Sequence, residues 1–131
     1  HRGAAPPGNA YDNPYNRAMP QARLAFCTCP DAATASRIAD ALVGERLAAC
    51  VSVLPGVQSV YRWQGEVERA DEVQLLAKTT DAAMPALVER IVALHPYELP
   101  EVVAVQAAAG LPAYLEWISE QVAPDAGGRE P

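Results

Sequence analysis

The spacing of apolar residues along the chain predicts helices and strands in a regular order. Short apolar or alternating runs predict strands over residues 22–28, 48–63, 67–80 and 102–107. Two segments carry apolar residues at the spacing that gathers them on one face of a helix: Ala35, Ile38, Ala39 and Leu42 in the first, Met84, Leu87, Val88, Ile91 and Leu94 in the second. A third helix is predicted after Gly110–Pro112.

This order, strand-helix-strand followed by strand-helix-strand, predicts an α+β protein with a ferredoxin-like βαββαβ fold. Its antiparallel sheet has both helices on one face, and the last helix is a C-terminal addition. We expect one domain over residues 21–122. Residues 1–20 have no apolar periodicity and are expected to be a flexible arm or an expression remnant, and residues 123–131 a disordered tail.

The second and third strands are predicted to form one long hairpin that turns at Gln64–Gly65. Arms of about fifteen residues reach up to roughly 50 Å when extended, whereas helices of about a dozen residues cover roughly 18 Å. The hairpin should therefore project beyond its own core, with Val60, Tyr61 and Trp63 near its tip. Such a strand favours a closed homo-oligomer. The alternative is a short, solvated hairpin, kinked at Pro55–Gly56, in a monomer.

Charge and composition narrow the possible functions. The 131 residues include 10 basic and 16 acidic side chains, a net charge of −6, which argues against nucleic acid as the main partner. No apolar run is long enough to span a membrane, and the N-terminus has no signal-peptide core, so a soluble, cytoplasmic protein is expected. The three cysteines are then expected to be reduced.

Cysteine and histidine supply the candidate metal ligands. In an extended strand, Cys27 and Cys29 direct both thiols to one face. We place Cys50 on the neighbouring strand and His95 at the end of the second helix, and thiolates with an imidazole suit copper or zinc. The alternative is that the cysteines pack as small apolar residues and that His95 is hydrogen-bonded at a helix end.

The segment His95–Glu101 joins the second helix to the last strand and holds an unusual set of side chains, His-Pro-Tyr-Glu-Leu-Pro-Glu. Its two prolines restrict the backbone. A thiol enzyme would use His95 as base with Glu98 or Glu101 as the orienting carboxylate. Because the chain has no strand-turn-helix nucleophile motif and no phosphate loop, we expect no enzyme activity.

Trp63 and Tyr97 are candidates to line a pocket between subunits with Lys78 and Glu101. Lys78 is the only lysine of the chain. The alternatives are that the aromatic rings pack in an interface and that Lys78 is a solvated or ion-paired charge.

Several motifs in order resemble the CutA divalent-cation tolerance family, over about residues 22–122: Leu47–Val51, Pro55-Gly56 followed by Tyr61-x-Trp63-x-Gly65, Glu72–Thr80, His95-Pro96-Tyr97-x-x-Pro100-Glu101 and Tyr114-x-x-Trp117. The resemblance implies a ferredoxin-like homotrimer whose long strands pair between subunits. It also implies a role in tolerance of copper or other divalent metal ions.

The ligands proposed for that family correspond to Cys27 and His95, with Cys50 a weaker candidate. Leu94 stands where some members have a second histidine, and Cys29 lies at a variable position. We therefore expect a homotrimer that binds or responds to copper or another divalent ion. The alternative is a PII-like regulatory or scaffolding trimer with a ligand cleft between subunits and no role for metal.

Overall fold

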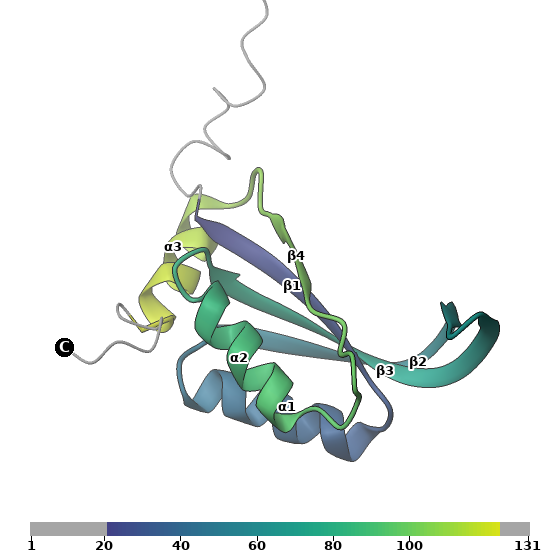
Figure 1. The fold of residues 1–131 in the computed structure, drawn as a ribbon. Coiled ribbons are helices and arrows are strands. Elements are labelled where there is room, and N and C mark those ends of the chain that lie inside the picture. The colour runs from purple at the N-terminus through teal and green to yellow at the C-terminus, as the bar shows by residue number, and fades with distance from the viewer. Residues whose placement is uncertain (1–20, 124–131) are drawn as a thin grey trace, which may run out of the picture.

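The protein consists of a four-stranded sheet and three helices, seen in a computed structural model that describes residues 21–123 (Figure 1). Along the chain the elements are β1 (Ala22–Cys29), α1 (Ala32–Gly44), β2 (Cys50–Trp63), β3 (Glu66–Thr80), α2 (Met84–Leu94), β4 (Val103–Gln106) and α3 (Pro112–Gln121). The predicted ferredoxin-like order and the additional C-terminal helix are confirmed. The arm expected at residues 1–20 and nearly all of the expected tail lie outside the described residues.

The strands are ordered β2-β3-β1-β4, and all neighbouring pairs are antiparallel. Because β3 lies between β1 and β2, the expectation that Cys50 occupies the strand next to Cys27 is wrong. The short β4 pairs only with residues Arg23–Phe26 of β1. The last part of β1, which carries Cys27 and Cys29, extends beyond that pairing.

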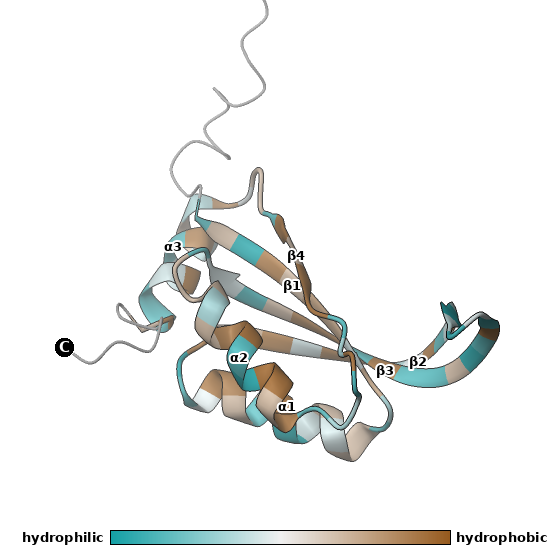
Figure 2. Ribbon diagram, in the orientation of Figure 1, coloured by the Kyte–Doolittle hydropathy of each residue, from teal (hydrophilic) through white to brown (hydrophobic). Residues whose placement is uncertain are grey.

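The two faces of the sheet differ in their surroundings. Alternate residues such as Ala25, Cys27 and Leu75 are buried on the face that α1 and α2 cover, together with Ile38 and Leu87 of the helices (Figures 1 and 2). The intervening residues of the strands lie on the opposite face, which we call the open face. Apolar residues of β4, Val103 and Val105, are exposed there.

Local sequence explains where the helices begin and end. Asp31, before α1, accepts a hydrogen bond from the backbone N–H of Thr34 at 2.8 Å. This bond lowers the pKa of the Asp31 carboxyl. Pro85 lies in the first turn of α2, where its missing N–H costs nothing. Within residues 21–123, no helix is both long and apolar enough to cross a membrane.

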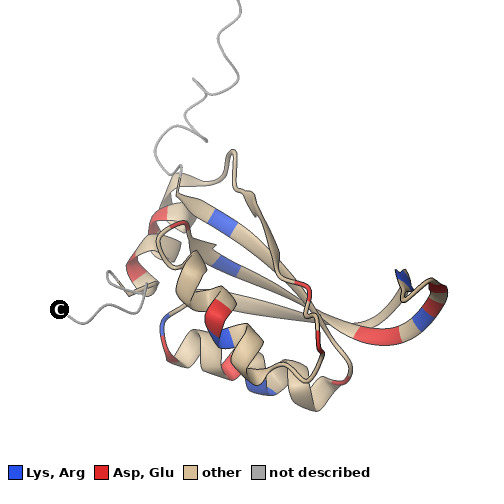
Figure 3. Ribbon diagram, in the orientation of Figure 1, with Lys and Arg blue, Asp and Glu red and all other residues tan. Residues whose placement is uncertain are grey.

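The hairpin of β2 and β3 projects beyond the helices, as expected, and its end curls away from the core (Figure 1). Gln64 (φ 51°) and Gly65 (φ 85°) form its two-residue turn, whose twist suits a hairpin. The register shifts between Leu54 and Val57, at the expected Pro55–Gly56 irregularity. The projecting part carries several charged residues, among them Arg62, Glu66, Glu68 and Arg69 (Figure 3). Val60, Tyr61 and Val67 are nevertheless exposed there.

Candidate metal site and open-face cavity

The end of α2 places His95 against the end of β1. Its backbone N–H closes the helix by donating to Ile91 O at 2.8 Å, and its ψ of 138° is extended, as the following Pro96 requires. The residue His95 is 7% exposed. His95 is thus held by the helix end and by the residue after it.

Hydrogen bonds engage both nitrogens of His95 and define its tautomer. Nε2 lies 2.7 Å from Thr28 O, and the N–H of Tyr97 lies 3.2 Å from Nδ1. A carbonyl oxygen can only accept and a backbone N–H can only donate, so Nε2 carries the proton and Nδ1 is the acceptor. His95 in this state is a neutral ring with a lone pair directed at Tyr97 N–H.

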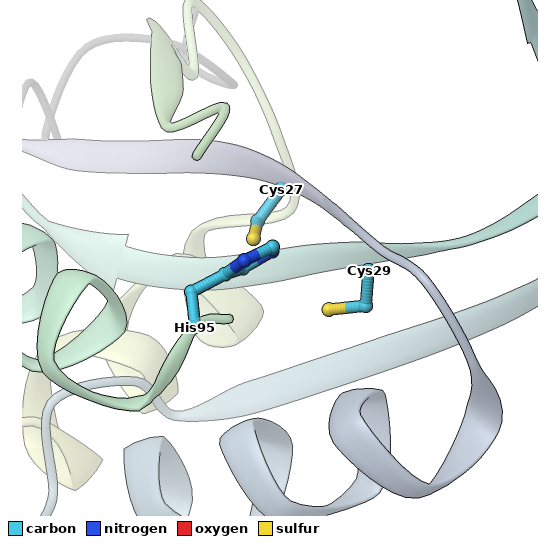
Figure 4. Close-up of side chains that lie close together, drawn as sticks. All are labelled: Cys27, Cys29 and His95. Atoms are coloured by element: carbon cyan, nitrogen blue, oxygen red, sulfur yellow. The ribbon is translucent and has the colours of Figure 1, made fainter. Parts of the chain in front are cut away.

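Cys27, Cys29 and His95 form one buried cluster on the helix face (Figure 4). Their potential ligand atoms all lie within 4.8 Å of one another. Among residues 21–123, these three residues form the group that could hold a metal ion. Two thiols and an imidazole are a donor set for a soft or borderline ion such as copper or zinc. The C-x-C spacing predicted that both thiols share a face, and the structure brings His95 to them.

The two thiols of the cluster affect each other's ionisation. A hydrogen bond between them raises the pKa of Cys27, which burial raises further, and the same bond lowers the pKa of Cys29. Thr28 O, 3.8 Å from Cys27 Sγ, is a second acceptor for the Cys27 thiol. Cys29 is therefore the thiol that ionises more readily, and thiolate is the form that binds metals.

Cys50 lies outside this cluster, on the other face of the sheet. Cys50 of β2 pairs with Lys78 of β3, and Lys78 pairs with Leu24 of β1, so these three side chains lie on the same face. Leu24 is three positions before Cys27 along β1. Since side chains alternate between faces, Cys27 and Cys50 point in opposite directions. The Cys50 Sγ lies 3.8 Å from Lys78 Nζ. Within one chain, Cys50 and Lys78 are partners of each other.

A cavity of about 810 Å³ lies on the open face, between the hairpin and the segment that follows α2. Three of the four predicted cleft residues, Trp63, Tyr97 and Glu101, line it, while Lys78 does not. Glu72 and Thr28 also contribute to its wall. The predicted pocket residues are therefore mostly together in a single chain.

Two hydrogen bonds tie this wall to the segment 96–101. The hydroxyl of Tyr97 donates to Glu72 Oε2 at 2.5 Å, and the hydroxyl of Thr28 donates to Glu101 Oε1 at 3.2 Å. Burial raises the pKa of the Tyr97 hydroxyl, and the hydrogen bond to Glu72 raises this pKa further. Glu72 is only 7% exposed. Sequence reasoning named Glu72 only as the first residue of a family motif and not as a site residue, although an acidic residue just before the buried run of β3 was a usable signal.

Fold and cluster together define a small ferredoxin-like protein with a long hairpin and a buried set of candidate ligands for a metal ion. Residues 23–121 match the family model "CutA1 divalent ion tolerance protein". The chain belongs to this family, as the motifs of the sequence predicted.

Relatives of known sequence or structure agree with this assignment. A divalent-cation tolerance protein CutA of Thermus thermophilus is 55% identical over 97 residues, covering 74% of this chain and 94% of that protein. Protein CutA of Mus musculus is 44% identical over 96 residues, 73% of this chain but only 54% of the mouse protein. The crystal structure of CutA from Xylella fastidiosa is 51% identical and matches with a TM-score of 0.77 over 79% of this chain and 99% of that one.

Proposed function

We propose that this protein binds copper or another metal ion at Cys27, Cys29 and His95, as part of divalent-cation tolerance and without catalytic turnover. The observation that carries this proposal is the buried cluster itself, whose ligand atoms lie within 4.8 Å of one another. Cys29 takes the place in the ligand set that the sequence had suggested for Cys50. Buried thiols free of disulfides favour a reducing compartment such as the cytoplasm.

The chemistry of the donor set suits a soft ion. Cys27 and Cys29 extend from the same side of β1, and His95 is held against them by the end of α2. Three protein ligands leave one position of a tetrahedral zinc site for water or a further ligand, and they are sufficient for trigonal copper(I). Thiolates disfavour hard ions such as Mg²⁺, which prefer oxygen ligands.

A metal titration of the reduced protein tests the proposal. Under anaerobic conditions, we expect one Zn²⁺ or Cu⁺ per chain, and Cys27→Ser and Cys29→Ser should each weaken binding at least about tenfold, because a hydroxyl is a poor ligand for soft ions. Competition with a chromophoric chelator measures the affinity. Cys50→Ser is the matched control and should bind as the wild type does. Equal affinity in all four proteins would disprove the site.

We further propose that three chains assemble, as the family resemblance implies. Two features support an assembly: β2 lies at the edge of the sheet, and the projecting hairpin exposes Val60, Tyr61 and Val67. An exposed edge strand with apolar side chains is a site where another chain adds. The exposed Val103 and Val105 extend this argument to the open face.

Sedimentation equilibrium at micromolar concentration tests the assembly. We expect a single species of three times the 13.9 kDa chain mass. Val60→Glu, which introduces a charge at the projecting hairpin, should shift the protein toward the monomer, whereas Val43→Glu on the exposed side of α1 should not. A wild-type protein that sediments only as a monomer would contradict the proposal.

A second candidate function is favoured by the cavity on the open face. A regulatory or scaffolding trimer of the PII-like kind would bind a small molecule there, next to Trp63, Tyr97 and Glu101, and would need neither thiol as a ligand. The metal titration separates the two functions, because a regulatory or scaffolding trimer predicts no loss of metal affinity in the cysteine variants.

A further inference from the structure

We propose that Tyr97 and Glu72 control the access of a metal ion to His95, and thereby couple the cluster on the helix face to the cavity on the open face. The inference rests on the proposed metal site. It starts from an observation that the donor set alone does not explain: both nitrogens of the candidate imidazole ligand already have hydrogen-bond partners.

The tautomer of His95 identifies the nitrogen that would bind the ion. Nδ1 is unprotonated, and its lone pair accepts a hydrogen bond from the N–H of Tyr97 at 3.2 Å. A metal ion that binds Nδ1 therefore has only this N–H to displace. To bind through Nε2, the ring would have to lose both a proton and the 2.7 Å bond to Thr28 O. A metal-bound histidine commonly donates its other N–H to a carbonyl. Thr28 O already accepts this bond, so Nδ1 is the assigned ligand atom.

The position of Tyr97 therefore decides whether Nδ1 is available. Its side chain extends to the other face of the sheet, where its hydroxyl donates to Glu72 Oε2 at 2.5 Å. The acceptor is the carboxylate of Glu72, a residue that is only 7% exposed, and a charge-assisted hydrogen bond at such a buried residue is costly to break. The rings of His95 and Tyr97 also contact each other, with centroids 4.7 Å apart. The Tyr97–Glu72 bond holds the backbone N–H over Nδ1.

Binding of a metal and the arrangement of the cavity are consequently linked. When the ion occupies Nδ1, Tyr97 N–H moves away, and the Tyr97 side chain, which lines the cavity, moves with it. Linkage is reciprocal. A molecule that fills the cavity and retains the Tyr97–Glu72 bond weakens metal binding, and metal binding weakens the affinity for that molecule.

Removal of the Tyr97 hydroxyl tests this control with Zn²⁺ as the probe. In Tyr97→Phe the arrangement in which Tyr97 N–H lies over His95 Nδ1 loses the hydrogen bond to Glu72 that holds it. The fraction of chains with a free Nδ1 then rises, and Zn²⁺ should bind about tenfold more tightly. Glu72→Gln keeps a neutral acceptor and should give a smaller gain, about threefold. Tyr61→Phe is the matched control, because Tyr61 lines the same cavity; its affinity should equal that of the wild type.

Two readouts distinguish failure of this inference from failure of the metal site. Chelator competition gives the Zn²⁺ affinity, and long-range ¹H–¹⁵N correlation spectra of the histidine ring identify the nitrogen that is bound. Zn²⁺ that binds the wild type through Nε2, or with equal or lower affinity in Tyr97→Phe, overturns the control by Tyr97 while the metal site stands. A wild type that binds no Zn²⁺ and no Cu⁺ overturns both.

Discussion

Replacement of Ile38 by alanine is expected to lower the free energy of unfolding by about 4 kcal/mol, which is large for a domain of this size. Ile38 is 0% exposed and belongs to the apolar stripe by which α1 packs on the sheet. Its loss removes buried methyl and methylene groups and leaves a cavity that rigid strands cannot fill. The reduced stability would show that this stripe, recognised from its spacing alone, holds the helix in place.

Urea unfolding followed by circular dichroism measures this change. All proteins should be compared at one chain concentration, because assembly adds to the apparent stability. Val43→Ala on the same helix is the control: Val43 is 43% exposed, and its replacement should change stability by no more than about 0.5 kcal/mol. Equal effects of the two substitutions would contradict the packing of α1 described above.

His95→Ala is expected to lower the free energy of unfolding by about 3 kcal/mol in protein free of metal. The substitution removes a buried ring and leaves Thr28 O and Tyr97 N–H without the partners they have in the structure. A buried carbonyl or amide without a partner costs about 1–3 kcal/mol. A residue that served only as a metal ligand would have little effect on the metal-free protein.

Thermal unfolding in the presence of a chelator separates these two roles of His95. Glu98→Ala provides the control, because Glu98 is exposed in the same segment and should leave the melting temperature nearly unchanged. An unchanged melting temperature for His95→Ala would mean that the hydrogen bonds of the ring do not stabilise the fold. The sequence offered a ring bonded at a helix end and a metal ligand as alternatives. The structure shows the bonds, and the proposed metal site uses the same ring.

The fold could be predicted because its signals are local. Ile38 and Leu87 lie in apolar stripes, Asp31 precedes a helix and bonds to Thr34, and Gln64–Gly65 is a turn of the hairpin type. Each signal depends on a few neighbouring residues. The strict alternation in a strand also predicted that the thiols of β1 lie on one face.

The position of Cys50 could not be predicted from such local signals. Strands that follow each other in sequence need not be neighbours in a sheet, and in this fold β3 separates β1 from β2. A shift of one residue in register reverses the face of a side chain. The bond between Tyr97 and Glu72 was missed for a similar reason, because it depends on where the segment after α2 crosses the edge of the sheet.

The end of β1, beyond the reach of β4, also has a consequence for the order of folding. Thr28 and His95 are 67 positions apart in the chain, whereas the two arms of the β2–β3 hairpin are connected by a two-residue turn. Contacts between distant segments carry a larger loop-closure cost and form later than local ones. The hairpin has only a two-residue loop to close, whereas the cluster requires β1 to have paired and α2 to have packed. At the proposed metal site, all three candidate ligands are therefore together only in a chain that has already folded, so the complete site is a product of folding.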